Sequence, residues 1–149
     1  MKNLWVLVVI AVFILLGFGL SRMKHPELTP DLSRSELIGV VEGCDLAEQR
    51  CAMHGYRLDF DRPVTPLSLF KARMNSEHPV DSAVLYLEMK DMDMGINRFK
   101  FLPGQEGAWE TDVMIPVCST GRRDWLVTLL VQRDGRSQRV VFPLSVEGK

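Results

Sequence analysis

Apolar and polar residues alternate over short stretches from about residue 36 onward, and turn residues separate these stretches. A period of two residues is typical of strands that bury one face. In the segment 82–89, for example, Ala83, Leu85, Leu87 and Met89 fall on the same face. The pattern predicts strands at residues 37–41, 56–60, 67–74, 83–89, 97–102, 109–115, 125–132 and 139–144, and it requires no helix of ordinary length.

The segment 125–131 is apolar on both faces, which is typical of a central strand that is covered on both sides. Asp134 and Gly135 follow it, and an Asp-Gly pair between two strands is a strong signal for a tight hairpin. Seven to eight short strands with frequent turns indicate an all-β domain. We therefore expect an immunoglobulin-like antiparallel β-sandwich over residues 36–149.

The start of the chain has a different pattern. Residues 3–21 contain no charged side chain, and a helix of that length spans about 30 Å, the thickness of the hydrocarbon core of a bilayer. We expect a single N-terminal transmembrane anchor there, with a short tail inside, the domain outside and a stalk over residues 22–35. A cleaved signal peptide is the alternative, but the apolar run is long for one and no small-x-small cleavage pattern follows it.

Composition and motifs exclude several functions. The chain has 18 Lys and Arg residues against 19 Asp and Glu residues, a net charge of −1, which argues against a nucleic-acid partner. It contains no G-x-S-x-G elbow, no H-E-x-x-H helix and no phosphate-binding glycine loop. We therefore expect a protein that is not an enzyme and for which no small-molecule substrate is evident.

The three cysteines are Cys44, Cys51 and Cys118, and their spacing matches neither a thioredoxin-type C-x-x-C motif nor a zinc ribbon. An odd number of cysteines in an exported domain leaves one outside any intramolecular pair. We favour a structural disulfide between Cys44 and Cys51, which leaves Cys118 free. A Cys51–Cys118 bridge between the two sheets is the alternative.

Methionines are concentrated where the predicted strand 83–89 runs into a turn. Met89, Met92 and Met94 fall within six positions, and Asp91 and Asp93 alternate with the last two. Met92 and Met94 point the same way in an extended chain, and thioethers are soft ligands that suit Cu(I). This spacing indicates a metal site in a polar loop, while packing in the core is the alternative role of methionine.

Cys118 lies in a predicted loop between two strands, where a free thiol can act as a third soft ligand beside Met92 and Met94. If it is buried as a small hydrophobic residue instead, it is inert. Met89 and His54 are further candidates. Met89 falls on the face expected to form the core, and a lone histidine such as His54 is more often a surface residue than a ligand.

Several segments carry a resemblance to a known group of proteins. They are DMDMGINR at 91–98, GAW at 107–109, IPVC at 115–118 and DW at 124–125, with Cys44 and Cys51 upstream. The chain resembles small proteobacterial membrane-anchored periplasmic proteins considered with Sco-type copper and cytochrome oxidase assembly factors. It is more distantly similar to the FixH and YtkA-like domains, which are single-span β-sandwiches.

The resemblance covers roughly residues 40–145 and implies an inner-membrane, single-pass protein with its soluble domain in the periplasm. It implies a role in binding or delivering copper as Cu(I), with Met92, Met94 and Cys118 as the positions of interest and a copper-delivery or oxidase-assembly protein as the partner. The chain departs from established copper carriers because it has no His-x-Met pair and no histidine-rich tail. A disulfide-stabilised interaction module of a membrane complex, with Met92 and Met94 as a contact surface, is the alternative function. A thiol redox protein that depends on Cys118 is a third.

Overall fold

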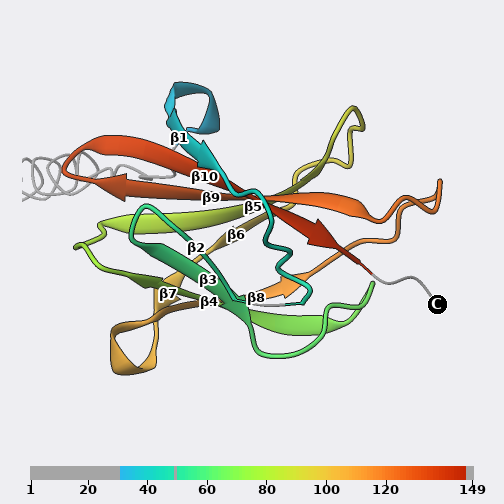
Figure 1. Cartoon of the computed structure of the whole chain (residues 1–149), viewed down its shortest axis with the longest axis horizontal. Coiled ribbons are helices and arrows are strands. Elements are labelled where there is room, and N and C mark those ends of the chain that lie inside the picture. Colours follow the sequence, from blue (N-terminus) through green and yellow to red (C-terminus); the bar gives the residue numbers. More distant parts are fainter. Residues whose placement is uncertain (1–30, 49, 147–149) are drawn as a thin grey trace, which may run out of the picture.

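The computed structural model describes residues 31–48 and 50–146, which form a sandwich of two five-stranded sheets (Figure 1). The strands are β1 (Glu36–Val40), β2 (Cys51–Met53), β3 (Tyr56–Phe60), β4 (Leu69–Ser76), β5 (Ser82–Met89), β6 (Arg98–Lys100), β7 (Leu102–Pro103), β8 (Trp109–Met114), β9 (Asp124–Arg133) and β10 (Arg136–Ser145). Two 3-10 turns, η1 (Leu32–Arg34) and η2 (Gln105–Gly107), complete the described elements. The all-β sandwich predicted from the alternation is confirmed.

Sheet A has the strand order β1-β10-β9-β5-β6, and sheet B has the order β2-β3-β4-β8-β7. Each predicted segment overlaps an observed strand, but the number of strands was predicted too low. The three-residue β2 is too short to show an alternation. The segment 97–102 is divided between β6 and β7, which lie in different sheets, because the chain crosses between the layers at the buried residue Phe101.

Strand β9 is the centre of sheet A. It pairs with β10 over its whole length, from Asp124↔Ser145 to Arg133↔Arg136, and with β5 on its other side. Its inward side chains enter the core, and the outward residues Thr128 and Leu130 are buried as well, as the two-sided apolar pattern predicts. The hairpin between β9 and β10 has positive φ at Asp134 (51°) and at Gly135 (73°), the backbone that a two-residue type I′ turn requires.

Strand β1 departs from the expected antiparallel arrangement because it pairs with β10 in parallel, with Glu36 opposite Gln138. The chain therefore enters the domain beside the β9–β10 hairpin. Arg139 fixes this entrance by donating hydrogen bonds to the Leu32 carbonyl (2.8 Å) and the Ser35 hydroxyl (3.1 Å). The last residues of the predicted stalk thus pack on the sandwich.

The loop between β1 and β2 contains the disulfide Cys44–Cys51, so the favoured pairing is confirmed and the Cys51–Cys118 alternative is wrong. Cys51 is fully buried in the core. Asp45 ties the same loop to the end of β10, since its carboxylate accepts hydrogen bonds from the Ser145 N–H (3.0 and 3.2 Å) and the Ala47 N–H (2.9 Å). The disulfide thus anchors the connection between the two sheets.

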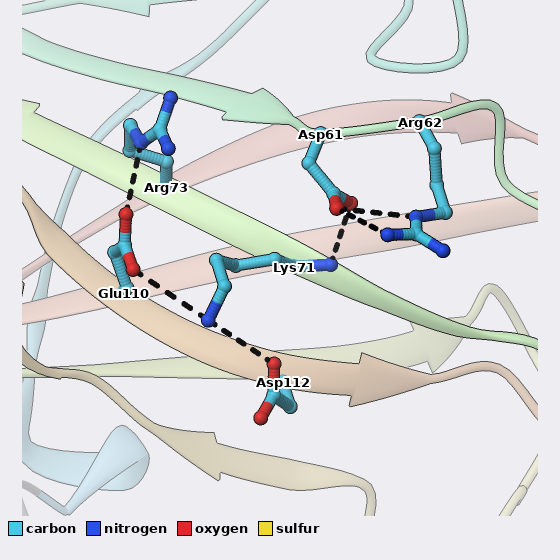
Figure 2. Close-up of polar contacts among 6 residues, drawn as sticks. All are labelled: Asp61, Arg62, Lys71, Arg73, Glu110 and Asp112. Atoms are coloured by element: carbon cyan, nitrogen blue, oxygen red, sulfur yellow. Dashed lines mark hydrogen bonds and ion pairs between the residues drawn. The ribbon is translucent and has the colours of Figure 1, made fainter.

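The outer face of sheet B carries charged side chains that neutralise one another (Figure 2). Lys71 lies between Asp112 (3.4 Å) and Glu110 (3.5 Å), and Glu110 also pairs with Arg73 (3.1 Å). Asp61 accepts a hydrogen bond from the Lys71 backbone N–H (2.7 Å) and pairs with the neighbouring Arg62. Such partly exposed pairs contribute little to stability each, but they leave no concentrated charge on this face.

Within residues 31–48 and 50–146, no helix has the length and apolar character needed to cross a membrane. The predicted anchor at 3–21 and most of the predicted stalk lie outside these residues.

We expect the double substitution of Cys44 and Cys51 by Ala to lower the free energy of unfolding by about 2–3 kcal/mol, because the disulfide closes a short loop and restricts the unfolded chain. Urea denaturation of the full chain measures this loss. Cys118→Ala is the matched control and should leave the free energy of unfolding nearly unchanged, since Cys118 is free and lies in a loop. Equal stability of the double variant and the wild type would contradict a structural role for the disulfide.

Candidate functional site

Two loops meet at the end of the sandwich opposite the β9–β10 hairpin, to the right in Figure 1. Residues 90–97 connect β5 to β6, and residues 115–123 connect β8 to β9. The pairing of β5 with β9 places Met89, the last residue of β5, opposite Trp125 near the start of β9. The loop that leaves β5 and the loop that enters β9 therefore lie side by side.

The contact between these loops joins two sulfur atoms. Cys118 Sγ lies 3.5 Å from Met92 Sδ, a distance at which the thiol can donate a weak hydrogen bond to the thioether. A second contact holds the loops together, in which the Arg122 guanidinium donates to the Lys90 carbonyl (2.9 Å). The structure thus brings together two of the three sulfur residues that the sequence singles out.

Local hydrogen bonds shape the methionine loop. Asp93 Oδ1 accepts from the Gly95 N–H (2.8 Å), and the Asn97 side-chain amide donates to the Met94 carbonyl (2.9 Å). Gly95 has φ 72° and Asp91 has φ 60°, so the chain turns twice within this loop. Met92 also forms a bridge with Met89, to whose carbonyl its N–H donates (3.3 Å). The thioether positions are thus fixed by the backbone of the loop.

The three methionines line one hollow of about 340 Å³, which Glu88 and Asp93 also line. Met89 is 4% exposed and belongs to the hydrophobic core, whereas Met92 and Met94 are half-buried and pack against the edge of the core. Met89 therefore has a packing role. The two thioethers that can reach a ligand are those of Met92 and Met94.

Hydrogen bonding favours the thiolate form of Cys118, which is half-buried. The Thr120 hydroxyl lies 3.0 Å from Cys118 Sγ and lowers the pKa of the thiol, together with the backbone N–H of Thr120. Burial opposes this effect, while the backbone N–H and positive charge of Arg122 add to it. The net result is a pKa of Cys118 below its ordinary value. A thiolate binds soft metals and reacts with electrophiles more readily than a thiol.

The sequence pattern does not single out Thr120. Its one sequence signal is the hydroxyl two residues after a loop cysteine, a spacing that also occurs without any contact. The contact between Thr120 and Cys118 depends on a tight turn in this loop, in which the Gly121 N–H donates to the Cys118 carbonyl (3.1 Å).

His54 lies away from the sulfur pair. It lines a separate hollow with Glu36, Tyr56, His78 and Gln138, beside the first residues of β1 and β10. The sulfur pair lies at the other end of β10, and seven residues of extended strand span about 23 Å. The structure therefore does not bring His54 into the candidate site.

Among the residues that the structure describes, no group of three or more His, Cys, Asp or Glu side chains is arranged to hold a metal ion. Cys118 and Met92 place two sulfur atoms together at this end of the domain, and sulfur ligands prefer soft ions. Comparison of the chain with protein-family models, with curated proteins and with solved structures finds no match.

We expect Thr120→Val to raise the pKa of the Cys118 thiol, because valine keeps the shape of the side chain and removes the hydroxyl that stabilises the thiolate. The rate of alkylation by iodoacetamide, followed against pH, measures this pKa. Its midpoint should move to higher pH in the valine variant and stay close to the wild-type value in Thr120→Ser. A midpoint that is unchanged in the valine variant would show that the hydroxyl does not act on the thiol.

Proposed function

We propose that this protein binds Cu(I) through Cys118 and Met92, with Met94 as a further ligand, and passes the ion to a partner in respiratory oxidase assembly. The observation that carries the proposal is the 3.5 Å contact between the free thiol and the thioether, which come from loops 26 residues apart in the chain. Cu(I) is the cargo in this proposal. The resemblance of the sequence to proteins considered with copper and cytochrome oxidase assembly factors supports the choice of oxidase assembly as the destination of the ion.

The chemistry of the donors fits a soft monovalent ion. One thiolate neutralises the single positive charge of Cu(I), and uncharged thioethers complete the coordination without adding charge. A hard ion such as Ca²⁺ takes about six to eight oxygen ligands, whereas the two side chains in contact here offer sulfur. The lowered pKa of Cys118 further supports metal binding, because the thiol must lose its proton before it can coordinate.

Transfer would proceed by ligand exchange, with copper remaining Cu(I) throughout. Binding releases the Cys118 proton to solvent. A sulfur ligand of the partner then bonds to the ion, the bond to Cys118 breaks, and the thiolate takes up a proton again. A site with two or three sulfur ligands on surface loops can release its ion as readily as it takes it up.

The finer architecture belongs to the same proposal. We take the sandwich to be immunoglobulin-like, with the order β3-β4-β8-β7 in one sheet and β10-β9-β5-β6 in the other as its support. The anchor at 3–21 would hold the domain at the inner membrane on the periplasmic side, where the Cys44–Cys51 disulfide is stable.

An interaction module that binds no metal is the second candidate function. Its support is a group of exposed apolar side chains near Cys118: Leu67 (65% exposed), Leu69 (61%), Met114 (47%) and Val117 (57%). Met92 and Met94 would then serve as an adaptable contact surface. Replacement of the thioethers by leucine separates the two functions, because leucine keeps the apolar bulk.

We expect Cys118→Ser to weaken Cu(I) binding by about 100-fold and the double variant Met92→Leu, Met94→Leu to weaken it by about tenfold or more, since each change removes soft donors. The measurement is competition with a chromogenic Cu(I) chelator, using the full chain in detergent under anaerobic conditions with ascorbate as the reductant.

Met53→Leu is the matched control, because Met53 is half-buried on β2 and lines neither hollow beside the sulfur pair. It should bind Cu(I) like the wild type. A wild-type protein that takes no Cu(I) from the chelator overturns the proposal, and leucine variants that bind as tightly as wild type assign the methionines to packing or contact.

A further inference from the structure

Cys118 lines a groove of about 470 Å³ that is separate from the methionine hollow. Its floor includes the buried side chains of Trp125 (2% exposed) and Val146 (3%). Its walls come from the loop between β3 and β4 at Pro66 and from the loop between β8 and β9 at Val117. This volume is in the range of sites that hold a ligand or a few side chains of a peptide.

Among the residues that the structure describes, the charged side chains that line this groove are those of Arg122 and Arg123. Arg122 is engaged by Asp124 and by the Lys90 carbonyl, whereas Arg123 is exposed and has no ion pair or side-chain hydrogen bond within residues 31–48 and 50–146. The described residues that line the methionine hollow include Glu88 and Asp93 and no basic residue. Of the sulfur pair, Met92 thus lines a hollow with carboxylates and Cys118 lines a groove with arginines.

Three exposed apolar side chains lie on the segments next to the groove, although none of them lines it: Leu67, Leu69 and Met114. Leu69 and Met114 are cross-strand neighbours on the outer face of sheet B, two residues from Lys71 and Asp112, whose ion pair Figure 2 shows.

Leu67 follows the groove residue Pro66 and is 65% exposed. Its φ of 58° lies in the left-handed region, which is unfavourable for leucine and favours Gly or Asn. This φ follows from the turn 65–68, in which Pro66 precedes Leu67 and the Ser68 N–H donates to the Thr65 carbonyl (3.3 Å). The turn leaves the leucine side chain exposed and open to a contact with another molecule.

We propose that this groove docks an extended segment of the Cu(I)-accepting partner, in which apolar residues and a sulfur ligand are flanked by carboxylates. The proposal rests on the Cu(I) function above and adds the surface and the chemistry by which the acceptor is recognised. The apolar residues would cover Val117 and Leu67, a carboxylate would pair with Arg123, and the sulfur would arrive beside Cys118. The arginines of the groove select an anionic segment. Because Cys118 lines the groove, a segment bound there brings its sulfur ligand next to the ion.

The test compares two acceptor peptides that differ in charge alone. The probes are the acetylated and amidated hexapeptide Glu-Leu-Cys-Leu-Cys-Glu and the same peptide with Lys in place of both Glu residues. Cu(I) transfer from the loaded full chain to each peptide is followed by stopped flow at low salt. We expect the acidic peptide to take the ion about tenfold faster, because opposite charges increase the rate of encounter, and the ratio should fall as salt is added.

Arg123→Glu should reduce the ratio of the two transfer rates to about one or reverse it, as expected for a loss of charge steering. Arg136→Glu is the matched control, since Arg136 is an exposed arginine beside the hairpin at the other end of the domain. It carries the same change in net charge and should keep the wild-type ratio.

Leu67→Asn separates docking from folding. Asparagine tolerates the left-handed backbone, so the melting temperature should stay the same or rise, while transfer to the acidic peptide should become several-fold slower. Leu37→Asn, an exposed leucine on β1, is the control and should leave the transfer rate unchanged.

Three results would overturn the inference. A wild-type protein that loads Cu(I) but transfers it equally fast to both peptides has no charged docking groove. If Arg123→Glu and Arg136→Glu change the ratio of the two transfer rates equally, the electrostatic steering of the peptides does not come from the groove. A dimer in sedimentation that Leu67→Asn converts to a monomer assigns the groove to a second copy of this chain. Failure to load Cu(I) at all is seen before any peptide is added, and it overturns the proposed function itself.

Discussion

The ten-residue pairing of β9 with β10 is the constraint on which the rest of the structure depends. The side chains of β9 are buried on both faces, so a shift of one residue in register would exchange the inward and outward sets and disrupt both packed surfaces. The type I′ turn at Asp134 and Gly135 fixes that register at one end. The other end of the pair then determines where the loop with Cys118 must emerge, because residue 124 lies opposite residue 145.

The sulfur contact is a consequence of this arrangement. Strand β5 pairs with β9 on the side away from β10, and it ends where β9 begins. The methionine loop leaves sheet A at that point, while the Cys118 loop arrives there from sheet B. Two segments that are distant in the sequence thus meet at one edge of the sandwich, and the loops need only short hydrogen-bonded turns to bring Met92 to Cys118.

The sequence predicts more of the fold than of the site, for physical reasons. Alternation of apolar and polar residues depends on local burial, so it identifies the long strands and the central place of β9, but not the three-residue β2. The parallel position of β1 depends on where the chain enters the sheet, which no local pattern encodes. Residue chemistry points to Met92, Met94 and Cys118, and topology then separates His54 from them. The contact of Thr120 with Cys118 and the groove both depend on how the loops fold against one another. Spacing along the chain does not reveal this arrangement.

The two hollows beside the sulfur pair differ in charge and in polarity, and this difference has a chemical meaning for the proposed transfer of Cu(I). Carboxylates beside the thioethers favour the presence of a cation, whereas arginines and apolar side chains beside the thiol favour an anionic, partly apolar protein segment. An ion held by one thiolate and one or two thioethers would keep an open side for a ligand of the partner. A closed set of four ligands would bind more tightly but would have to lose a ligand before any partner could add one. The open arrangement suits exchange better than storage, and the half-buried position of Cys118 on a loop suits it for the same reason.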